Sequence, residues 1–259
     1  MKTVQDIINL KGKKKIICLT SYTYLFAKIV DETGLVDVIL VGDSMNEVLF
    51  GERNTTTIPL DIMIWCAKSV RKAVKNAIVV FDMPFGTFHT PEKALESVVK
   101  IVKECDPDAV KLEGGKNIAE TIKKIVNMGI PVMGHVGLLP QRVRITGYKK
   151  QGKTEESAKE IFEDAKAVEE SGAFSVVLES VEENLAKKIT ETLKIPTIGI
   201  ASGEFCDGKI AVLEDILGLT QPPPKHIKPY DNLAQRIYEA VLKFAKDGKE
   251  NENKNENRQ

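Results

Sequence analysis

Short apolar runs rich in valine and isoleucine recur along the chain, and each is followed by a polar or glycine-containing turn. The runs are nearly continuous in hydrophobicity rather than alternating, which is typical of parallel strands buried on both faces. Seven of the runs are clear, and the last one in the following series is weaker. They cover Ile16–Leu19, Val38–Val41, Ile78–Phe81, Ala109–Leu112, Pro131–Gly134, Phe174–Leu178, Pro196–Ile200 and Ile216–Leu219.

Helical patterns fill most of the intervals between these runs. Thr90 followed by Pro91 is typical of a helix start, because threonine caps free N–H groups and proline suits the first helical position. Two further patterns stop at Gly129 and Gly172, and glycine commonly follows a helix end. The sequence predicts helices over Pro59–Val74, from Thr90 onward, and over Asn117–Met128, Thr154–Ser171, Val181–Leu193 and Asn232–Lys246.

Alternation of strand and helix about eight times over some 220 residues predicts an α/β protein with a (β/α)₈ barrel. A doubly wound open sheet is the alternative, since it also has parallel strands covered by helices. The glycine-rich motifs of nucleotide-binding open sheets do not occur, which disfavours those versions. We expect a short N-terminal helix, a single barrel domain over residues 1–246 and a disordered polar tail over 247–259, which contains no apolar residue.

The composition excludes several functional classes. Lysine and arginine together number 37, as do aspartate and glutamate, so the formal net charge is zero. This balance argues against nucleic-acid and membrane-surface partners, which require a long-range positive field. The four isolated cysteines give neither a disulfide framework nor a zinc signature. No apolar run reaches the length of a membrane span or of a signal peptide. We expect a cytoplasmic protein that acts on small molecules.

Ionisable side chains stand at the carboxyl ends of five consecutive predicted strands. In a (β/α)₈ barrel these ends converge on one site. Any one of the residues can be explained as a cap for the next helix, so the prediction depends on the set. The set comprises Asp43, Asp82, Lys111 with Glu113, His135 and Glu179.

Asp43, Asp82 and Glu113 are expected on adjacent strands, without an arginine to neutralise them. Carboxylates brought close together repel, so either some are protonated or a cation is present. Oxygen ligands suit Mg²⁺, which prefers one or two carboxylates together with waters and substrate oxygens. No cysteine or histidine partners suggest zinc. We expect a Mg²⁺ site in which Glu113 binds directly or through water; the alternative is that Asp82 and Glu113 only cap loops.

The other three strand-end groups each allow two interpretations. Glu179, at the rim of an apolar wall, is placed to accept a proton from carbon, or else it is a favourable charge at a helix start. Lys111 can hold a substrate carboxylate or form a Schiff base, although a neighbouring metal makes a Schiff base unnecessary. His135 can donate a hydrogen bond to the substrate or be a satisfied core histidine. The long, basic segment Gly137–Lys153 suggests a loop that closes over the site.

An ordered series of motifs with barrel spacing resembles the ketopantoate hydroxymethyltransferase family, over about residues 3–246. The motifs are Val41-Gly-Asp-Ser, Phe81-Asp-Met-Pro-Phe-Gly, Val110-Lys-Leu-Glu-Gly-Gly, Gly134-His-Val-Gly-Leu, Gly147-Tyr-Lys-Lys-Gln-Gly and Leu178-Glu. The resemblance implies a barrel related to the phosphoenolpyruvate/pyruvate superfamily and a homo-oligomer, commonly a decamer. It also implies transfer of a one-carbon unit from 5,10-methylenetetrahydrofolate to 3-methyl-2-oxobutanoate, giving 2-dehydropantoate for pantothenate and coenzyme A synthesis.

The resemblance also implies roles for individual residues. Asp43, Asp82 and Glu113 fall on the magnesium positions, and the two aspartates also touch the substrate. Ser44 and Lys111 fall on substrate-binding positions. The proton acceptor corresponds to Glu179, and the chemistry of the strand ends adds His135 as a further substrate contact.

Five positions depart from the family pattern, three of them in one loop. The second-strand loop reads Asp-Ser-Met-Asn-Glu where the family usually has Asp-Ser-Leu-Gly-Met, which places Glu47 near the metal loop. Cys66 and Glu214 stand where histidine is common. Two alternative functions stay open on the sequence: another Mg²⁺-dependent 2-oxo-acid lyase or mutase of the same superfamily, and a non-catalytic barrel that binds a metabolite.

Overall fold

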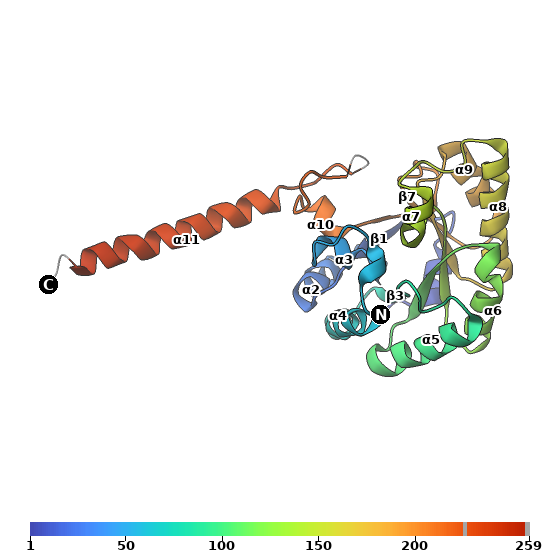
Figure 1. The fold of residues 1–259 in the computed structure, drawn as a ribbon, viewed down its shortest axis with the longest axis horizontal. Helices are drawn as coiled ribbons and strands as arrows, with labels where there is room; N and C mark the ends of the chain where they lie inside the picture. Colours follow the sequence, from blue (N-terminus) through green and yellow to red (C-terminus); the bar gives the residue numbers. More distant parts are fainter. Residues whose placement is uncertain (225–226, 257–259) are drawn as a thin grey trace. The chain divides into compact units, whose positions relative to one another are not determined.

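Eight parallel strands close into a barrel in the computed structural model, which describes residues 1–224 and 227–256 (Figure 1). Each strand pairs with the next along the chain, and β8 pairs with β1. This closure confirms the predicted (β/α)₈ barrel and excludes the open sheet. The strands are β1 Ile16–Thr20, β2 Val38–Val41, β3 Ile78–Asp82, β4 Ala109–Glu113, β5 Val132–Gly137, β6 Ser175–Glu179, β7 Thr197–Ile200 and β8 Gly208–Ala211.

The eighth strand is not where the sequence predicted it. The apolar run Ile216–Leu219 is not a strand, because Leu213–Ile216 forms the short helix α10 and a turn follows. An apolar run of four residues does not by itself distinguish a strand from a buried helix. The actual strand, β8, begins at Gly208, which pairs with Ile16 on one side and with Ile198 on the other. A Cβ at Gly208 would lie 2.6 Å from the Ile16 carbonyl oxygen, so only glycine fits where the ring closes.

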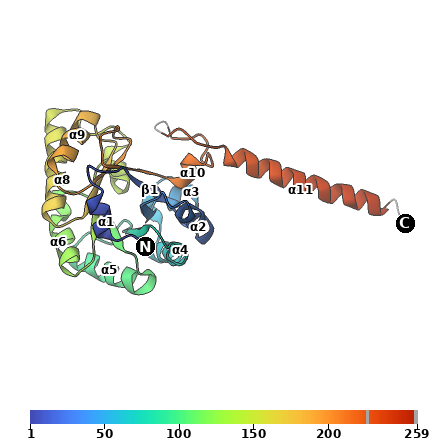
Figure 2. The ribbon, with the colours of Figure 1, turned by 180° about the vertical axis from the view of Figure 1, so that it is seen from behind.

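Helices surround the strands, and Figures 1 and 2 show α5, α6 and α8 on the outside of the barrel. The predicted Thr90 cap is confirmed, because Thr90 Oγ1 accepts a hydrogen bond from the Lys93 N–H at 3.2 Å. Thr154 caps α8 in the same way, accepting from the Ser157 N–H at 3.2 Å. The helices of residues 1–211 are α1 Val4–Asn9, α2 Tyr24–Glu32, α3 Met45–Val48, η1 Thr55–Thr57, α4 Leu60–Ala73, α5 Pro91–Cys105, η2 Lys116–Ile118, α6 Ala119–Asn127, η3 Pro140–Arg142, α7 Val143–Thr146, α8 Glu155–Glu170 and α9 Glu183–Thr192.

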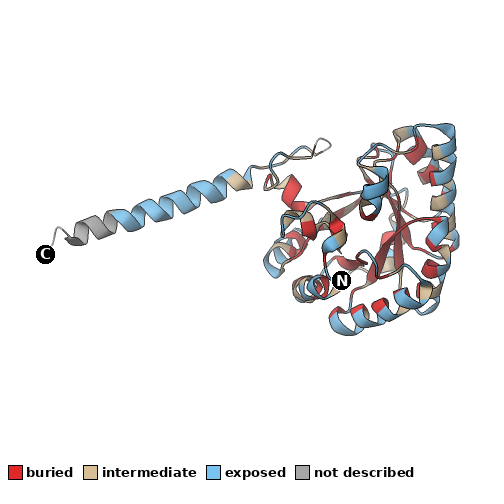
Figure 3. Ribbon diagram, viewed as in Figure 1, coloured by how far each residue is buried: buried red, intermediate tan, exposed pale blue. Residues whose placement is uncertain are grey.

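The strands are the most buried part of the barrel, and the outer faces of the helices are exposed (Figure 3). An apolar cluster takes side chains from the strands, among them Val38, Val80 and Met133. Ile7, which is 0% exposed, joins this cluster from the N-terminal helix α1. The expected short N-terminal helix is therefore confirmed, and it packs against the barrel core.

The chain divides into two compact units, Met1–Ala211 and Val212–Gln259, where the sequence predicted one domain over residues 1–246. The second unit contains α10 and the long helix α11, Leu233–Glu256. Its own hydrogen bonds include that from the Leu233 N–H to the Leu217 carbonyl, at 2.9 Å. Helix α11 continues ten residues beyond Lys246 into the expected disordered tail, whose residues 257–259 lie outside the described residues. No described helix combines the length and the apolar character needed to cross a membrane.

Candidate active site

The strand register brings the predicted site residues to one end of the barrel. Asp82 on β3 is level with Lys111 on β4, and Glu113 on β4 is level with His135 on β5. These four side chains and Asp43, which directly follows β2, are each no more than 5% exposed. Glu179 ends β6 and is half-buried. The predicted convergence of these residues is therefore seen in the structure, and it takes place in a largely dry environment.

Lys111 lies at the centre of the group. Its Nζ is 2.8 Å from Asp82 Oδ1, 3.8 Å from Glu113 Oε1 and 3.2 Å from His135 Nδ1. Burial disfavours its charge, but the carboxylates of Asp82, Glu113 and Asp43 outweigh burial and raise the pKa of Lys111. The amine is therefore a charged ammonium. Schiff-base formation requires a neutral amine, so the arrangement favours an ion-binding lysine.

The cluster holds more negative than positive charge. Three carboxylates face one ammonium, which leaves two charges unbalanced if all three carboxyl groups are ionised. Burial, followed by repulsion from Asp82 and Glu113, raises the pKa of Asp43 well above its usual range. Burial also raises the pKa of Glu113, to about 8. These shifts show that the cluster favours either protons or an additional cation.

The expected metal set of Asp43, Asp82 and Glu113 is not arranged to hold one ion directly, so a Mg²⁺ ion would use two of these carboxylates. Within residues 1–224 and 227–256, no three acidic, histidine or cysteine side chains are grouped closely enough to hold one ion together. Lys111 lies between Asp82 and Glu113. The Asp82 carboxylate lies against the Asp43 backbone, whose N–H donates to Asp82 Oδ2 at 3.3 Å, and the two carboxylates are near enough for Asp82 to raise the pKa of Asp43. Two carboxylates with waters and substrate oxygens are the usual Mg²⁺ environment, and Glu113 Oε1, which is buried without a hydrogen bond, can then accept from a metal-bound water.

The contacts of His135 determine its tautomer. An ammonium has only N–H donors, so His135 Nδ1 must accept from Lys111, and the ring proton is on Nε2. Burial, followed by the charge of Lys111, lowers the pKa of His135 well below its usual range, so the ring is neutral. Its Nε2 lies 3.3 Å from Glu179 Oε2. A neutral donor therefore faces the carboxylate that the sequence identified as the proton acceptor.

Ser44 is placed by a residue from the first strand loop. The Tyr22 hydroxyl lies 2.9 Å from Ser44 Oγ, and either oxygen can be the donor. Tyr22 is only 2% exposed, so its ring is held firmly in the core. This contact fixes the serine beside Asp43 at the start of α3.

Gln141 is a site residue that the sequence did not reveal. Its side-chain amide donates to Asp43 Oδ2 at 2.8 Å and to the Met83 carbonyl at 3.0 Å. Its backbone N–H donates to Glu113 Oε2 at 3.1 Å. Gln141 therefore connects the predicted loop Gly137–Lys153 to two of the three carboxylates. The only signal for it in the sequence was the unusual length of that loop.

The same loop makes a second contact with the loop after β2. The Tyr148 hydroxyl donates to Glu47 Oε1 at 3.4 Å, and burial together with the Glu47 charge raises the pKa of Tyr148 to about 12. Glu47, which departs from the family pattern, thus has a partner in the loop. No contact explains why Cys66 or Glu214 replaces histidine. His89 is exposed and bonded to the Gly86 carbonyl, and His226 lies outside the described residues.

A family model and curated relatives match nearly the whole chain and agree on one family. A family model described as ketopantoate hydroxymethyltransferase matches residues 1–254. The 3-methyl-2-oxobutanoate hydroxymethyltransferase of Pyrococcus furiosus is 46% identical over 250 residues, which cover 96% of this chain and 88% of that protein. The enzyme of the same name from Anaplasma marginale is 48% identical over 244 residues, or 94% of this chain and 87% of the relative.

Solved structures of other proteins share the fold of this chain. A phosphoenolpyruvate phosphomutase from Streptomyces platensis subsp. rosaceus matches with a TM-score of 0.67 at 12% identity, over 94% of this chain and 88% of that chain. A 2,3-dimethylmalate lyase of the PEP mutase/isocitrate lyase superfamily matches with a TM-score of 0.64 at 14% identity, over 96% and 86%. At these identities the likeness shows the fold alone. The sequence matches carry the identity: the chain belongs to the ketopantoate hydroxymethyltransferase family and is an enzyme.

Proposed function

We propose that the enzyme transfers a hydroxymethyl group from 5,10-methylenetetrahydrofolate to 3-methyl-2-oxobutanoate, giving 2-dehydropantoate for pantothenate and coenzyme A synthesis. The observation that carries the proposal is the buried Lys111 among three carboxylates, with the His135–Glu179 pair beside it. A 2-oxo acid has an anionic end for the lysine and two oxygens suited to a hard cation. The family match disfavours the lyase, mutase and metabolite-binding alternatives.

The cluster binds and orients the substrate in this proposal. Asp43 and Asp82 would hold Mg²⁺, and Glu113 would bind it through a water. When bound, Mg²⁺ polarises the 2-oxo group as a Lewis acid. The Lys111 ammonium and the Ser44 hydroxyl bind substrate oxygens, and charge-assisted hydrogen bonds of this kind are strong in a dry site. Tyr22 keeps the Ser44 hydroxyl in place.

Glu179 removes the proton from C3 of the bound substrate in this proposal. The proton passes from carbon to the Glu179 carboxylate, and the carbon left behind forms a bond to the methylene carbon of the folate donor. The two bonds from that methylene carbon to folate nitrogens break, one water supplies the hydroxyl oxygen of the product, and the protons released by the substrate and the water end on the nitrogens of tetrahydrofolate. The neutral His135 presents its Nε2–H toward Glu179 and the substrate, which orients both. The loop Gly137–Lys153 limits water access, which protects the reactive one-carbon donor from hydrolysis.

We propose further that the enzyme is a cytoplasmic homo-oligomer, with a decamer as the expected state. The support within the barrel unit is an apolar surface on α2 and α4, where Leu25, Ile29 and Trp65 are 71%, 62% and 71% exposed. Large exposed apolar side chains grouped together are typical of protein interfaces. Light scattering coupled to size exclusion measures the mass directly, and a monomeric mass contradicts the proposal.

Hydrogen exchange at C3 tests the chemistry without the folate donor. The purified enzyme is mixed with 3-methyl-2-oxobutanoate in D₂O with Mg²⁺, and loss of the C3 proton signal is followed by NMR. We expect exchange that depends on the enzyme, stops on addition of EDTA and returns with excess Mg²⁺. An enzyme that catalyses no exchange, or exchange insensitive to EDTA, contradicts the proposed function.

A further inference from the structure

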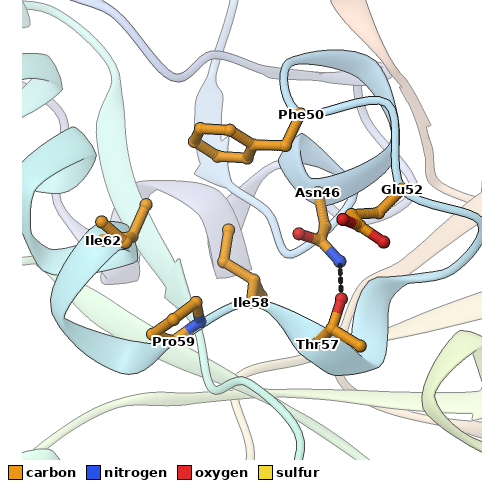
Figure 4. A pocket seen from close by; sticks show the side chains of 7 residues that line it. All are labelled: Asn46, Phe50, Glu52, Thr57, Ile58, Pro59 and Ile62. Carbon is orange, nitrogen blue, oxygen red and sulfur yellow. Dashed lines mark hydrogen bonds between the residues drawn. The ribbon is translucent and has the colours of Figure 1, made fainter.

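A pocket to which the proposed mechanism assigns no ligand is lined by residues of α3, η1 and α4 and of the segments between them (Figure 4). Its volume is about 350 Å³. One side is apolar and the other polar. The apolar lining is Phe50, Ile58, Pro59 and Ile62, and the polar lining is Asn46, Glu52 and Thr57.

The pocket begins one helical turn from a proposed metal ligand. The Asn46 N–H donates to the Asp43 carbonyl at 3.0 Å, so the two residues are stacked along the start of α3. On its other side, η1 with Thr57 packs against η3, which carries Gln141. A rise of 1.5 Å per residue separates Asn46 from Asp43 by roughly 5 Å along the helix. A ring bound in the pocket is therefore within reach of a substrate held by Asp43.

The polar wall offers mainly hydrogen-bond acceptors, and the Thr57 hydroxyl, which accepts from Asn46, adds one O–H donor. Both amide hydrogens of Asn46 are used, in bonds to the Asn54 carbonyl at 2.7 Å and to Thr57 Oγ1 at 2.8 Å. The Asn46 side-chain oxygen is left as an acceptor. Within the part of the chain that the structure describes, the Glu52 carboxylate forms no hydrogen bond or ion pair. The Glu52 backbone is fixed, because its N–H donates to the Asn46 carbonyl at 3.0 Å.

The apolar wall offers a flat surface that a ring can cover. Phe50 is 52% exposed and Ile62 is 38% exposed, and Figure 4 shows the Phe50 ring at the top of the pocket and Ile62 across the pocket from Glu52. An aromatic ring with a free face stacks favourably on another planar ring. The ligand that suits the pocket is therefore planar, with adjacent N–H donors along one edge.

We propose that this pocket binds the reduced pterin ring of the one-carbon donor, an assignment that rests on the proposed function. The pterin edge carries a ring N–H next to an amino group, and this pair can donate two parallel hydrogen bonds to the Glu52 carboxylate. The ring stacks on Phe50, and its one-carbon unit points toward the end of β2. Tetrahydrofolate and modified pterins share this ring and differ in their tails, so Glu52 serves either donor.

Binding of tetrahydrofolate to the Glu52→Gln variant tests the assignment. The substitution removes a negative charge and also removes a hydrogen-bond acceptor, and these two losses change the affinity in opposite directions. Loss of a negative charge alone would strengthen binding of the anionic glutamate tail. Loss of a paired acceptor weakens binding of the ring, by roughly 10-fold or more for hydrogen bonds to a charged group. We expect isothermal titration calorimetry to show weaker binding of tetrahydrofolate and of 6-methyltetrahydropterin, with p-aminobenzoylglutamate binding no weaker. Asp61→Asn is the matched control, since Asp61 is exposed near the pocket but does not line it.

Two further variants keep the test independent of one substitution. Glu52→Asp retains the carboxylate and should recover part of the affinity, and Phe50→Ala should weaken both ring-containing probes. The C3 exchange reaction should stay at the parent rate in all of them, because it needs no pterin. The assignment is overturned if Glu52→Gln binds tetrahydrofolate as tightly as the parent, or if it loses C3 exchange and pterin affinity together. Failure of the proposed function would instead appear as absent C3 exchange in the parent enzyme.

Discussion

The Gln141 side-chain amide and Asp43 Oδ2 are joined by a 2.8 Å hydrogen bond between residues 98 positions apart. This bond connects the long loop after β5 to the end of β2. Because the Gln141 backbone also binds Glu113, one residue holds two carboxylates of the cluster in fixed positions. Hydrogen bonds from this loop therefore hold the carboxylates of the proposed metal site in place.

Replacement of Gln141 by alanine should weaken both the fold and Mg²⁺ binding. The buried Asp43 oxygen and the Met83 carbonyl lose their donor, and unsatisfied buried groups of this kind cost about 1–3 kcal/mol. We expect a lower free energy of unfolding in urea and a weaker Mg²⁺ affinity by calorimetry. Gln151→Ala is the control, because the Gln151 side chain bonds only to the exposed Lys149 carbonyl. Equal effects of the two substitutions would show that Gln141 has no special role.

Lys111→Met should destabilise the enzyme strongly when Mg²⁺ is removed. Breaking a buried ion pair from one side typically costs 3–5 kcal/mol, because the partner charge stays buried. Added Mg²⁺ should restore part of the loss, since it binds only the folded cluster. Urea unfolding with EDTA and with Mg²⁺ measures both effects. Lys68→Met, which removes an exposed pair with Glu104, should change stability by less than about 1 kcal/mol. If Lys111→Met lowers the free energy of unfolding by no more than Lys68→Met does, Lys111 does not have this central role.

His135 should remain neutral well below the ordinary histidine pKa of 6.5. The unfolded chain takes up a proton at this residue as the pH falls below about 6.5, and the folded enzyme does not. Stability contributed by His135 is therefore present above that pH and is lost as the pH falls, by up to about 1.4 kcal/mol per pH unit. Unfolding free energies between pH 7 and 5 should fall more steeply for the parent than for His135→Gln. The prediction is contradicted if the unfolding free energies of the parent and of His135→Gln fall equally with pH, or if ¹⁵N NMR shows the His135 ring titrating near 6.5. The His89→Gln variant is the control.

Glu179→Gln should abolish C3 exchange while keeping substrate binding. An amide cannot accept the proton, and a positioned general base typically contributes about 10²–10⁴-fold to the rate. Binding of 3-methyl-2-oxobutanoate, followed by calorimetry with Mg²⁺, should change little, because the proposed oxygen contacts come from other residues. Glu191→Gln alters an exposed carboxylate on α9 and serves as the control. Exchange at the parent rate in Glu179→Gln would assign the base to another group.

The residues at the strand ends could be predicted for two reasons. Apolar runs that mark strands recur regularly along the chain, and the ionisable residues of the site directly follow those runs. Asp82, Glu113 and Glu179 each follow a buried apolar run, so counting strands was enough to expect that they meet. The position of Lys111 between the carboxylates was not predictable. It depends on the register of β3 against β4, which residue patterns do not fix.

The parts that the sequence did not predict depend on tertiary contacts or on weak local signals. Gln141 has no local feature that distinguishes it from other loop residues. Its role depends on the packing of η3 against Asp43, which follows β2. The last strand contains glycine and an exposed lysine, Lys209, so it lacked the apolar run that marked the others. The polar sequence after Lys246 has no apolar periodicity, yet it continues a helix that begins at Leu233.

The lateness of β8 in the chain has a consequence for biosynthesis. Only Gly208–Ala211 join the two ends of the row of strands, and these four residues leave the ribosome after the other seven strands. Until then β1 and β7 each expose an unpaired edge, which favours association between nascent chains. A chain that ends before Gly208 therefore lacks the strand that covers both edges.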